Sequence, residues 1–172
     1  MIVSRPGPDE YAPYYGTYVD KVPGADALAP LVAQRGSTAA ALAAIPEGMA
    51  SYRYAPGKWT LREVVGHLTD AERIFGYRLM RIARGDATPL ASFDENSYVP
   101  EGRFERRPLK EVAAEFAVVR DGTLALLRGL DEEVLARRGV ASGKPVSARA
   151  LAWIIAGHEI HHMGVIDQRY LA

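Results

Sequence analysis

The chain has 172 residues, which is long enough for one hydrophobic core and short for two full domains, so a single domain over residues 1–172 is predicted. Its 21 basic and 21 acidic side chains balance at pH 7 without forming a basic stripe, so nucleic-acid binding is not expected. The chain has no cysteine, which excludes disulfides, thiolate metal ligands and a cysteine nucleophile.

The amino terminus predicts neither a signal peptide nor a membrane segment. Its first residues contain no long apolar run and are interrupted by Pro6, Pro8 and Pro13. The longest apolar stretch, residues 150–157, is far shorter than the ~20 residues that cross a bilayer. We therefore expect a cytoplasmic protein without membrane contact. Residues 1–24 are rich in proline and tyrosine, and we expect them to form an extended N-terminal arm that covers a site or contacts a second subunit.

Two segments in the first half of the chain carry the periodicity of amphipathic helices. The first follows Gly24 and closes before Pro46. In the second, Thr60 and Glu63 form the pattern of a capping box and open a helix that runs to about Gly85. The apolar positions of this second helix repeat every 3.6 residues and predict one buried face. They are Leu61, Val64, Val65, Leu68, Ala71, Ile74, Phe75, Leu79 and Ile82.

Two more helices are predicted in the second half. The third begins near Pro108, a residue favoured at the first helical position, and ends at Gly129. Asp131 is placed to cap a short turn, and the fourth helix begins around Ser147 and runs almost to the last residue. No segment shows a convincing strand pattern. Four amphipathic helices without a sheet bury their stripes against one another, so the predicted fold is all-α, a four-helix bundle.

The connection over residues 86–107 is too long for a simple turn. Connections of this length inside a domain are usually functional or cross over between parallel helices, and this one could do both. Its residues Asp94, Glu95 and Asn96 could reach a nearby site or simply be solvated.

The four histidines fall in two places, and this clustering is the strongest functional signal. His67 lies in the second helix, and His158, His161 and His162 lie within five residues of the fourth. Residues four apart share one face of a helix, so His158 and His162 can offer two imidazoles to one ion. Both lie on the apolar stripe of their helix, and His67 lies near the edge of the buried face of its own. His161 is offset from the pair.

These positions predict a three-histidine metal site. The alternative is that the imidazoles are buried and satisfied by hydrogen bonds alone. A shared divalent ion explains three imidazoles on apolar stripes more simply, and bundle interiors are known places for such sites. Imidazole suits zinc, nickel, copper and iron, of which we expect zinc or nickel. Three protein ligands leave a coordination position for water or substrate, as in catalytic sites.

The same stretch also satisfies the HExxH pattern of zinc peptidases, with Glu159 as the general base. Only ten residues follow His162 and none is a histidine or glutamate, so the downstream third ligand of such peptidases is missing. Glu159 points about 100° away from His158 around the helix, so we expect it on a solvated face or orienting a ligand. A peptidase is therefore not predicted.

Three stretches carry a resemblance to a known family: GKWTLREVVGHLTDAERIFGYR at residues 57–78, SFDENSY at 92–98 and AGHEIHHMGVIDQRY at 156–170. With them the chain resembles the DinB-like (DinB/YfiT) superfamily of metal-binding helical bundles over nearly its full length. The resemblance implies up-down-down-up connectivity, a homodimer, and a divalent metal held by one histidine of the second helix and two of the last. Here those positions are His67, His158 and His162.

For the reaction, the resemblance implies a metal-dependent hydrolase or a transferase that uses a small thiol such as bacillithiol or mycothiol. An ion in such a site lowers the pKa of bound water toward ~7 or binds a thiolate. Because the chain has no cysteine, the thiol would be a co-substrate beside a small-molecule substrate. The alternative is a non-enzymatic binding or stress-response protein, in which the ion cross-links the second and fourth helices.

Three carboxylates are the candidate catalytic residues: Glu63, Asp70 and Glu159. Glu63 and Asp70 lie one helical turn to either side of His67, where a carboxylate can orient a ligating imidazole. Equally, Glu63 could be engaged in the capping box and Asp70 paired with Arg73. Aromatic and basic residues are less informative. Trp59 and Trp153 are expected in the core or as a lid, and Tyr77 and Arg78 either position an anionic substrate or are solvated or paired.

Overall fold

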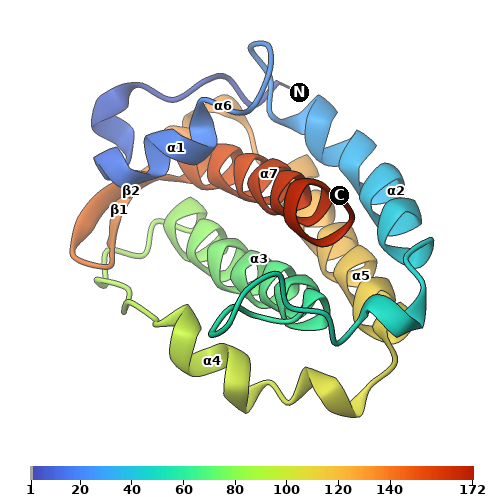
Figure 1. Ribbon diagram of the computed structural model, residues 1–172. Coiled ribbons are helices and arrows are strands. Elements are labelled where there is room, and N and C mark those ends of the chain that lie inside the picture. Colours follow the sequence, from blue (N-terminus) through green and yellow to red (C-terminus); the bar gives the residue numbers. More distant parts are fainter. Residues whose placement is uncertain (1) are drawn as a thin grey trace.

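Four long helices form the body of the protein in this computed structural model, which describes residues 2–172 (Figure 1). They are α2 (Leu28–Ala43), α3 (Leu61–Ala83), α5 (Leu109–Arg128) and α7 (Ala148–Val165). Both α2 and α3 contact α5 and α7, so the four helices close into a ring. The all-α, four-helix-bundle fold is confirmed, and the up-down-down-up connectivity stays a prediction. Among the described residues, no helix combines the length and the apolar character that crossing a membrane requires.

Side-chain caps define where the helices begin. The Thr60 hydroxyl accepts a hydrogen bond from the Glu63 N–H at 3.2 Å, and the Glu63 carboxylate accepts one from the Thr60 N–H at 2.6 Å. Ser147 caps α7 through the Ala150 N–H, and Asp131 caps α6 (Glu132–Leu135). These contacts satisfy N–H groups that have no partner inside the helix. The predicted starts of three elements are therefore confirmed.

The apolar stripe predicted for α3 faces the interior. All its members are buried except Ile74, which is half-buried. Most of α7 is buried on every side over its first twelve residues, so this helix lies at the centre of the molecule. A helix buried all round shows a continuous apolar run rather than a stripe. It continues beyond Val165 as a short π-helical turn, η5 (Ile166–Tyr170).

The connection over residues 86–107 is partly helical and lies along the outside of α3 (Figure 1). It contains α4 (Glu95–Glu101) and a 3-10 turn, η4 (Phe104–Arg106). The Phe104 ring sits so close to Gly66 that a Cβ there would lie 2.4 Å from it. Arg78 is buried and donates to the Ala91 carbonyl at 2.6 Å, so α3 holds the connection at both ends.

The N-terminal segment departs from the predicted extended arm. It forms η1 (Pro8–Glu10), η2 (Pro13–Tyr15) and α1 (Gly16–Val19), and α1 packs against α7 (Figure 1). The Trp153 indole N–H donates to the Val3 carbonyl at 2.9 Å. At Gly157 a Cβ would lie 2.0 Å from the Tyr18 carbonyl oxygen, so only glycine allows this approach. Prolines begin two of these turns because their fixed φ suits a first helical position.

The segment before α7 forms a β-hairpin, whereas the sequence predicts no strand there. Strand β1 (Arg138–Ala141) pairs antiparallel with β2 (Lys144–Ser147). The two turn residues, Ser142 and Gly143, have φ of 54° and 71°, which matches the twist of a tight hairpin. The hairpin is anchored to the connection after α3, where the Leu90 N–H donates to the Val140 carbonyl. A further short turn, η3 (Glu47–Met49), follows α2.

Candidate metal centre

The structure brings His67, His158 and His162 together. His67 projects from α3 and the other two from α7, and one ring nitrogen of each lies within 4.8 Å of the others. The Nε2 atoms of His67 and His158 are 3.2 Å apart. His158 and His162 are neighbours because they are separated by one helical turn. The packing of α3 against α7 thus brings histidines from two distant parts of the sequence into one cluster of nitrogen donors.

Burial keeps these imidazoles neutral. It lowers the pKa of His67 to about 4, and together with the neighbouring histidines it lowers the pKa of His162 to about 3. The pKa of His158 is lowered well below its usual value for the same reasons. A neutral imidazole carries a free lone pair on one ring nitrogen, which is the form that binds metals. Three such nitrogens facing one another fit a divalent ion of the zinc type.

His161 does not belong to this group. Its ring is half-buried and lies beside Tyr18, with ring centres 5.6 Å apart, and beside His162 at 4.9 Å. The helix turns by about 100° per residue, so a side chain next to a ligand points elsewhere. The separation of His161 from the other three, expected from spacing, is what the structure shows.

A cavity of about 270 Å³ opens onto the three histidines. Half of its lining residues are tyrosine, tryptophan or phenylalanine: Tyr14, Tyr15, Tyr18, Trp59, Phe75 and Phe93. The Trp59 ring lies 4.8 Å from the His67 ring, and the Tyr18 ring lies 5.2 Å from that of His158. Glu95 of α4 is the carboxylate in this lining. The N-terminal segment supplies the three tyrosines and so covers the site. This is the first of the two alternatives expected for that segment.

Two of the candidate carboxylates are engaged away from this cavity. Glu63 accepts hydrogen bonds from Thr60 in the capping box and pairs with Arg53 at 3.1 Å. Asp70 pairs with Arg73 at 3.3 Å, and burial raises its pKa despite that partner. Neither residue lines the cavity over the histidines. The capping and pairing alternatives therefore describe the positions of both side chains.

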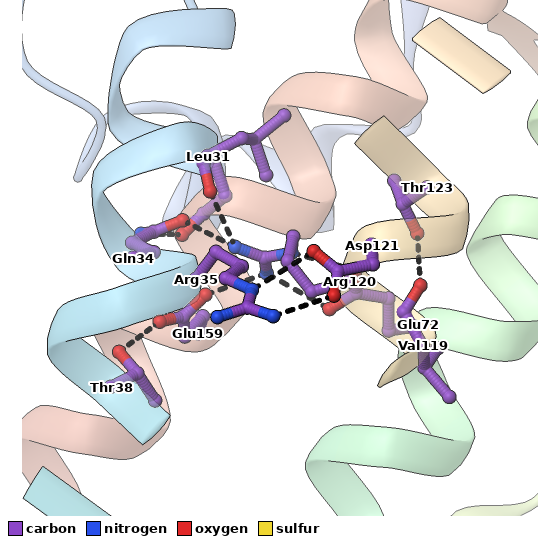
Figure 2. Close-up of polar contacts among 11 residues, drawn as sticks. Leu31, Gln34, Arg35, Thr38, Glu72, Val119, Arg120, Asp121, Thr123 and Glu159 are labelled. Atoms are coloured by element: carbon purple, nitrogen blue, oxygen red, sulfur yellow. Dashed lines mark hydrogen bonds and ion pairs between the residues drawn. The ribbon is translucent and has the colours of Figure 1, made fainter. Parts of the chain in front are cut away.

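Glu159 is buried, with 2% of its surface exposed, so the expectation of a solvated face is wrong. Its carboxylate lies 2.6 Å from the Arg120 guanidinium and accepts a short hydrogen bond from Thr38 (Figure 2). Arg120 in turn donates to Glu72 at 2.7 and 2.9 Å. Burial raises the pKa of Glu159 even with Arg120 beside it. The glutamate of the HExxH string is thus part of a buried ion-pair network with Arg120 and Glu72.

Sequence reasoning missed Arg120, although a signal was present. Arg120 lies four residues after Phe116 and seven before Leu127, which places it on the apolar stripe of α5. A charged residue on such a stripe requires a buried partner of opposite charge. Fully buried Arg120 finds two of them in Glu72 and Glu159.

The remaining predicted residues have distinct positions. Asp94 caps α4 through the Asn96 N–H, while the next residue, Glu95, lines the cavity. Trp153 is fully buried in the core. Arg78 is buried but binds the Ala91 carbonyl and the Ser142 hydroxyl, so it positions loops. Tyr77 is half exposed beside Arg81.

The family model described as the DinB superfamily matches residues 31–166, which include all four histidines. Comparison with curated protein sequences gives no match.

Several solved structures share the fold. YfiT from Bacillus subtilis, described as a probable metal-dependent hydrolase with an unusual four-helix bundle topology, has a TM-score of 0.71 and 17% identity, over 95% of this chain and 89% of that one. The mycothiol-dependent maleylpyruvate isomerase has a TM-score of 0.65 and 14% identity, over 80% and 58%. A DinB-like protein of Bacillus subtilis, YjoA, has 0.58 and 24%, over 82% and 86%. At these identities the likeness shows the fold alone.

Proposed function

The chain belongs to the DinB superfamily, and from that premise we propose that it is a divalent-metal-dependent enzyme acting on a small molecule. The observation that carries the proposal is the convergence of three neutral imidazoles, His67, His158 and His162, at a cavity. In this proposal they hold the ion; imidazole suits zinc, nickel, copper and iron, of which we expect zinc or nickel. When bound, such an ion supplies Lewis acidity, which lowers the pKa of a water or thiol that it coordinates.

The chain's own residues shape the rest of the site. The aromatic wall offers apolar surface to the substrate. Trp59 packs against His67 and restrains the orientation of its ring. Glu95 can accept a hydrogen bond from a substrate N–H or O–H, and no catalytic role is needed for Glu63 or Asp70 because both are engaged elsewhere.

Two reaction classes fit this proposal. One is hydrolysis, the description attached to YfiT, and the other is a thiol-dependent reaction, the description attached to the maleylpyruvate isomerase. Because the chain has no cysteine, the second class requires a low-molecular-weight thiol as co-substrate. A homodimer in the cytoplasm stays a prediction of the sequence.

The test begins with metal content. Protein purified without an affinity tag and offered zinc or nickel should retain about one equivalent per chain, and His67→Ala should retain less than about a tenth of that. The loaded protein is then assayed against a panel of esters and against pairs of a small thiol and an electrophile. Retention below a tenth of an equivalent by the wild type would overturn the metal site. A large metal-dependent rise in melting temperature without turnover on any pair would favour the non-enzymatic alternative.

A further inference from the structure

A second cavity, of about 290 Å³, adjoins the first at the histidine cluster. The two share Trp59, His161 and His162, and the rest of their linings differ. Residues that line both cavities lie between them. Trp59, His161 and His162 therefore border both cavities.

The walls of the second cavity are held in place by hydrogen bonds. The Tyr170 hydroxyl donates to the Trp59 carbonyl at 2.7 Å, which ties the C-terminal turn to the loop before α3. Arg53 donates to the Lys58 carbonyl at 2.5 Å. Gly57 has a φ of 75°, a conformation that favours glycine, and it turns the chain immediately before Lys58. The cavity is thus built from a fixed loop and a fixed helix end.

The two cavities differ in charge. Two consecutive residues of α4 line different cavities: Glu95 lines the first and Asn96 lines the second. Among the described residues that line the second cavity, Lys58 is the charged side chain and there is no carboxylate. Asn96 and Tyr54 add an amide and a hydroxyl that can donate hydrogen bonds. Lys58 is an exposed side chain, and the Glu63 carboxylate pairs with Arg53 at 3.1 Å rather than with Lys58.

We propose that the second cavity binds the anionic group of a co-substrate, a carboxylate or a phosphate, while the first binds an apolar partner. The two molecules then meet at His162. The meeting at a reactive centre rests on the proposed function, whereas anion binding beside Lys58 does not. A reaction between two substrates, rather than hydrolysis of one, is the class that this arrangement serves.

The test follows the Trp59 indole N–H signal by NMR in the zinc-loaded full chain, with Trp59→Phe identifying that signal from that of Trp153. Propionate and methylphosphonate are the anionic probes, and propionamide is the neutral control of the same shape. We expect at least one anion to bind about fivefold more tightly than propionamide at low ionic strength. The tighter of the two anions identifies the carboxylate or the phosphate class.

Lys58→Gln should lower the affinity for the anion by about fivefold. Lys110→Gln is the matched control, since it removes the same charge from an exposed position on α5 that lines neither cavity, and should leave affinity unchanged. Equal affinity for propionate, methylphosphonate and propionamide, or an unaltered Lys58→Gln variant, would overturn the proposal. An anion that bound only to the zinc ion would no longer shift the Trp59 signal after chelation, and it would bind Lys58→Gln as tightly as the wild type. Failure of the metal site would instead appear as low zinc retention, so the two results are distinguishable.

Simultaneous occupancy tests the two-cavity arrangement. With the first cavity saturated by the neutral aromatic 4-methylphenol, the dissociation constant of the anion should change by less than about twofold, since independent sites do not compete. Competition between the two probes would show a single subsite and contradict the proposal.

Discussion

Two adjacent histidines of α7 have different surroundings in this molecule. His162 faces His67 and His158, whereas His161 lies beside Tyr18. The difference follows from the rotation of about 100° per helical residue. Spacing alone therefore separates a position in the histidine cluster from a neighbouring histidine outside it.

Replacing each of these histidines by alanine tests that distinction. His162→Ala removes one of three donors, and we expect zinc affinity to fall by more than about 100-fold, beyond the loss seen when an outer partner of a ligand is removed. His161→Ala should change zinc affinity by less than about threefold, because its ring nitrogens are outside the cluster. Isothermal titration calorimetry with a competing chelator measures both. Equal losses for the two variants would contradict the assignment.

The positions of the three clustered histidines could be predicted because each depends on local periodicity within one helix. The environment of Glu159 could not. Its partners, Thr38 and Arg120, lie on α2 and α5, and a pattern in α7 reports which face a residue is on but not which helix covers that face. The buried guanidinium on the α5 stripe was the available clue.

At the scale of elements, the N-terminal segment depends on close contact between α1 and α7. The Tyr18 carbonyl oxygen would lie 2.0 Å from a Cβ at position 157, and a backbone atom cannot move aside as a flexible side chain can. Any side chain at Gly157 must therefore push α1 outward. The tyrosines that α1 and the preceding turn bring to the cavity would move with it.

Gly157→Ala and Gly164→Ala form a matched pair in the same helix. We expect Gly157→Ala to lower the free energy of unfolding by about 2 kcal/mol or more, because overpacking forces the backbone apart. A Cβ at Gly164 meets nothing within 4 Å, so Gly164→Ala should raise that free energy by about 0.5–1 kcal/mol through helix propensity. Urea denaturation measures both. Equal effects of the two substitutions would show that α1 is not seated on α7.

A second attachment of the N-terminal segment is sensitive to pH. Buried Glu10 accepts a hydrogen bond from Arg149 at 2.7 Å and another from the Gly7 N–H. Burial acts to raise the pKa of Glu10, but these hydrogen bonds outweigh it and lower the pKa to about 2. A carboxyl whose pKa is lower in the folded state stabilises the fold above its unfolded pKa. That stability is lost as pH falls from about 4.5 toward about 2.

Glu10→Gln should therefore be less stable than the wild type by about 2 kcal/mol at pH 6–7, the value for hydrogen bonds to a charged group. The difference should shrink as pH falls below 4.5. Urea denaturation of both proteins between pH 3 and pH 7 measures it. Glu133→Gln, at a side chain that is 88% exposed, should change stability by less than about 0.5 kcal/mol. A Glu10→Gln difference that stayed constant with pH would contradict the role of the ion pair.

How well an element could be predicted depends on the range of the contacts that create it. The helices could be predicted because caps and stripes are local, as Thr60 with Glu63 shows. The hairpin could not, since its four-residue strands include Gly139 and Pro145 and show no clear alternation. Its turn at Ser142 and Gly143 was the only local sign. The docking of the N-terminal turns depends on partners more than a hundred residues away, such as Trp153 for Val3.

At the scale of the whole molecule, one buried arginine connects all four long helices. Arg120 of α5 binds Glu72 of α3 and Glu159 of α7, and it donates to the Leu31 carbonyl and the Gln34 side chain of α2 (Figure 2). The backbone of α7 is tied in as well, because Gln34 donates to the Ala156 carbonyl at 3.0 Å. Two buried carboxylates depend on this one guanidinium, so its removal leaves both without their cation.

Arg120→Met should therefore lower the free energy of unfolding by about 3–5 kcal/mol, since removing one partner of a buried ion pair leaves uncompensated charge in the interior. Arg35→Met is the matched control. Arg35 makes an equally well-formed pair with Asp121, at 2.7 and 2.9 Å, but about half of each side chain is exposed, so its loss should cost about 1 kcal/mol or less. Urea denaturation of the two variants compares the same substitution at a buried and an exposed pair. If Arg120→Met cost no more than Arg35→Met, the ion pairs of Arg120 would add no more to stability than an exposed pair does. The buried network would then be a consequence of the fold rather than one of its supports.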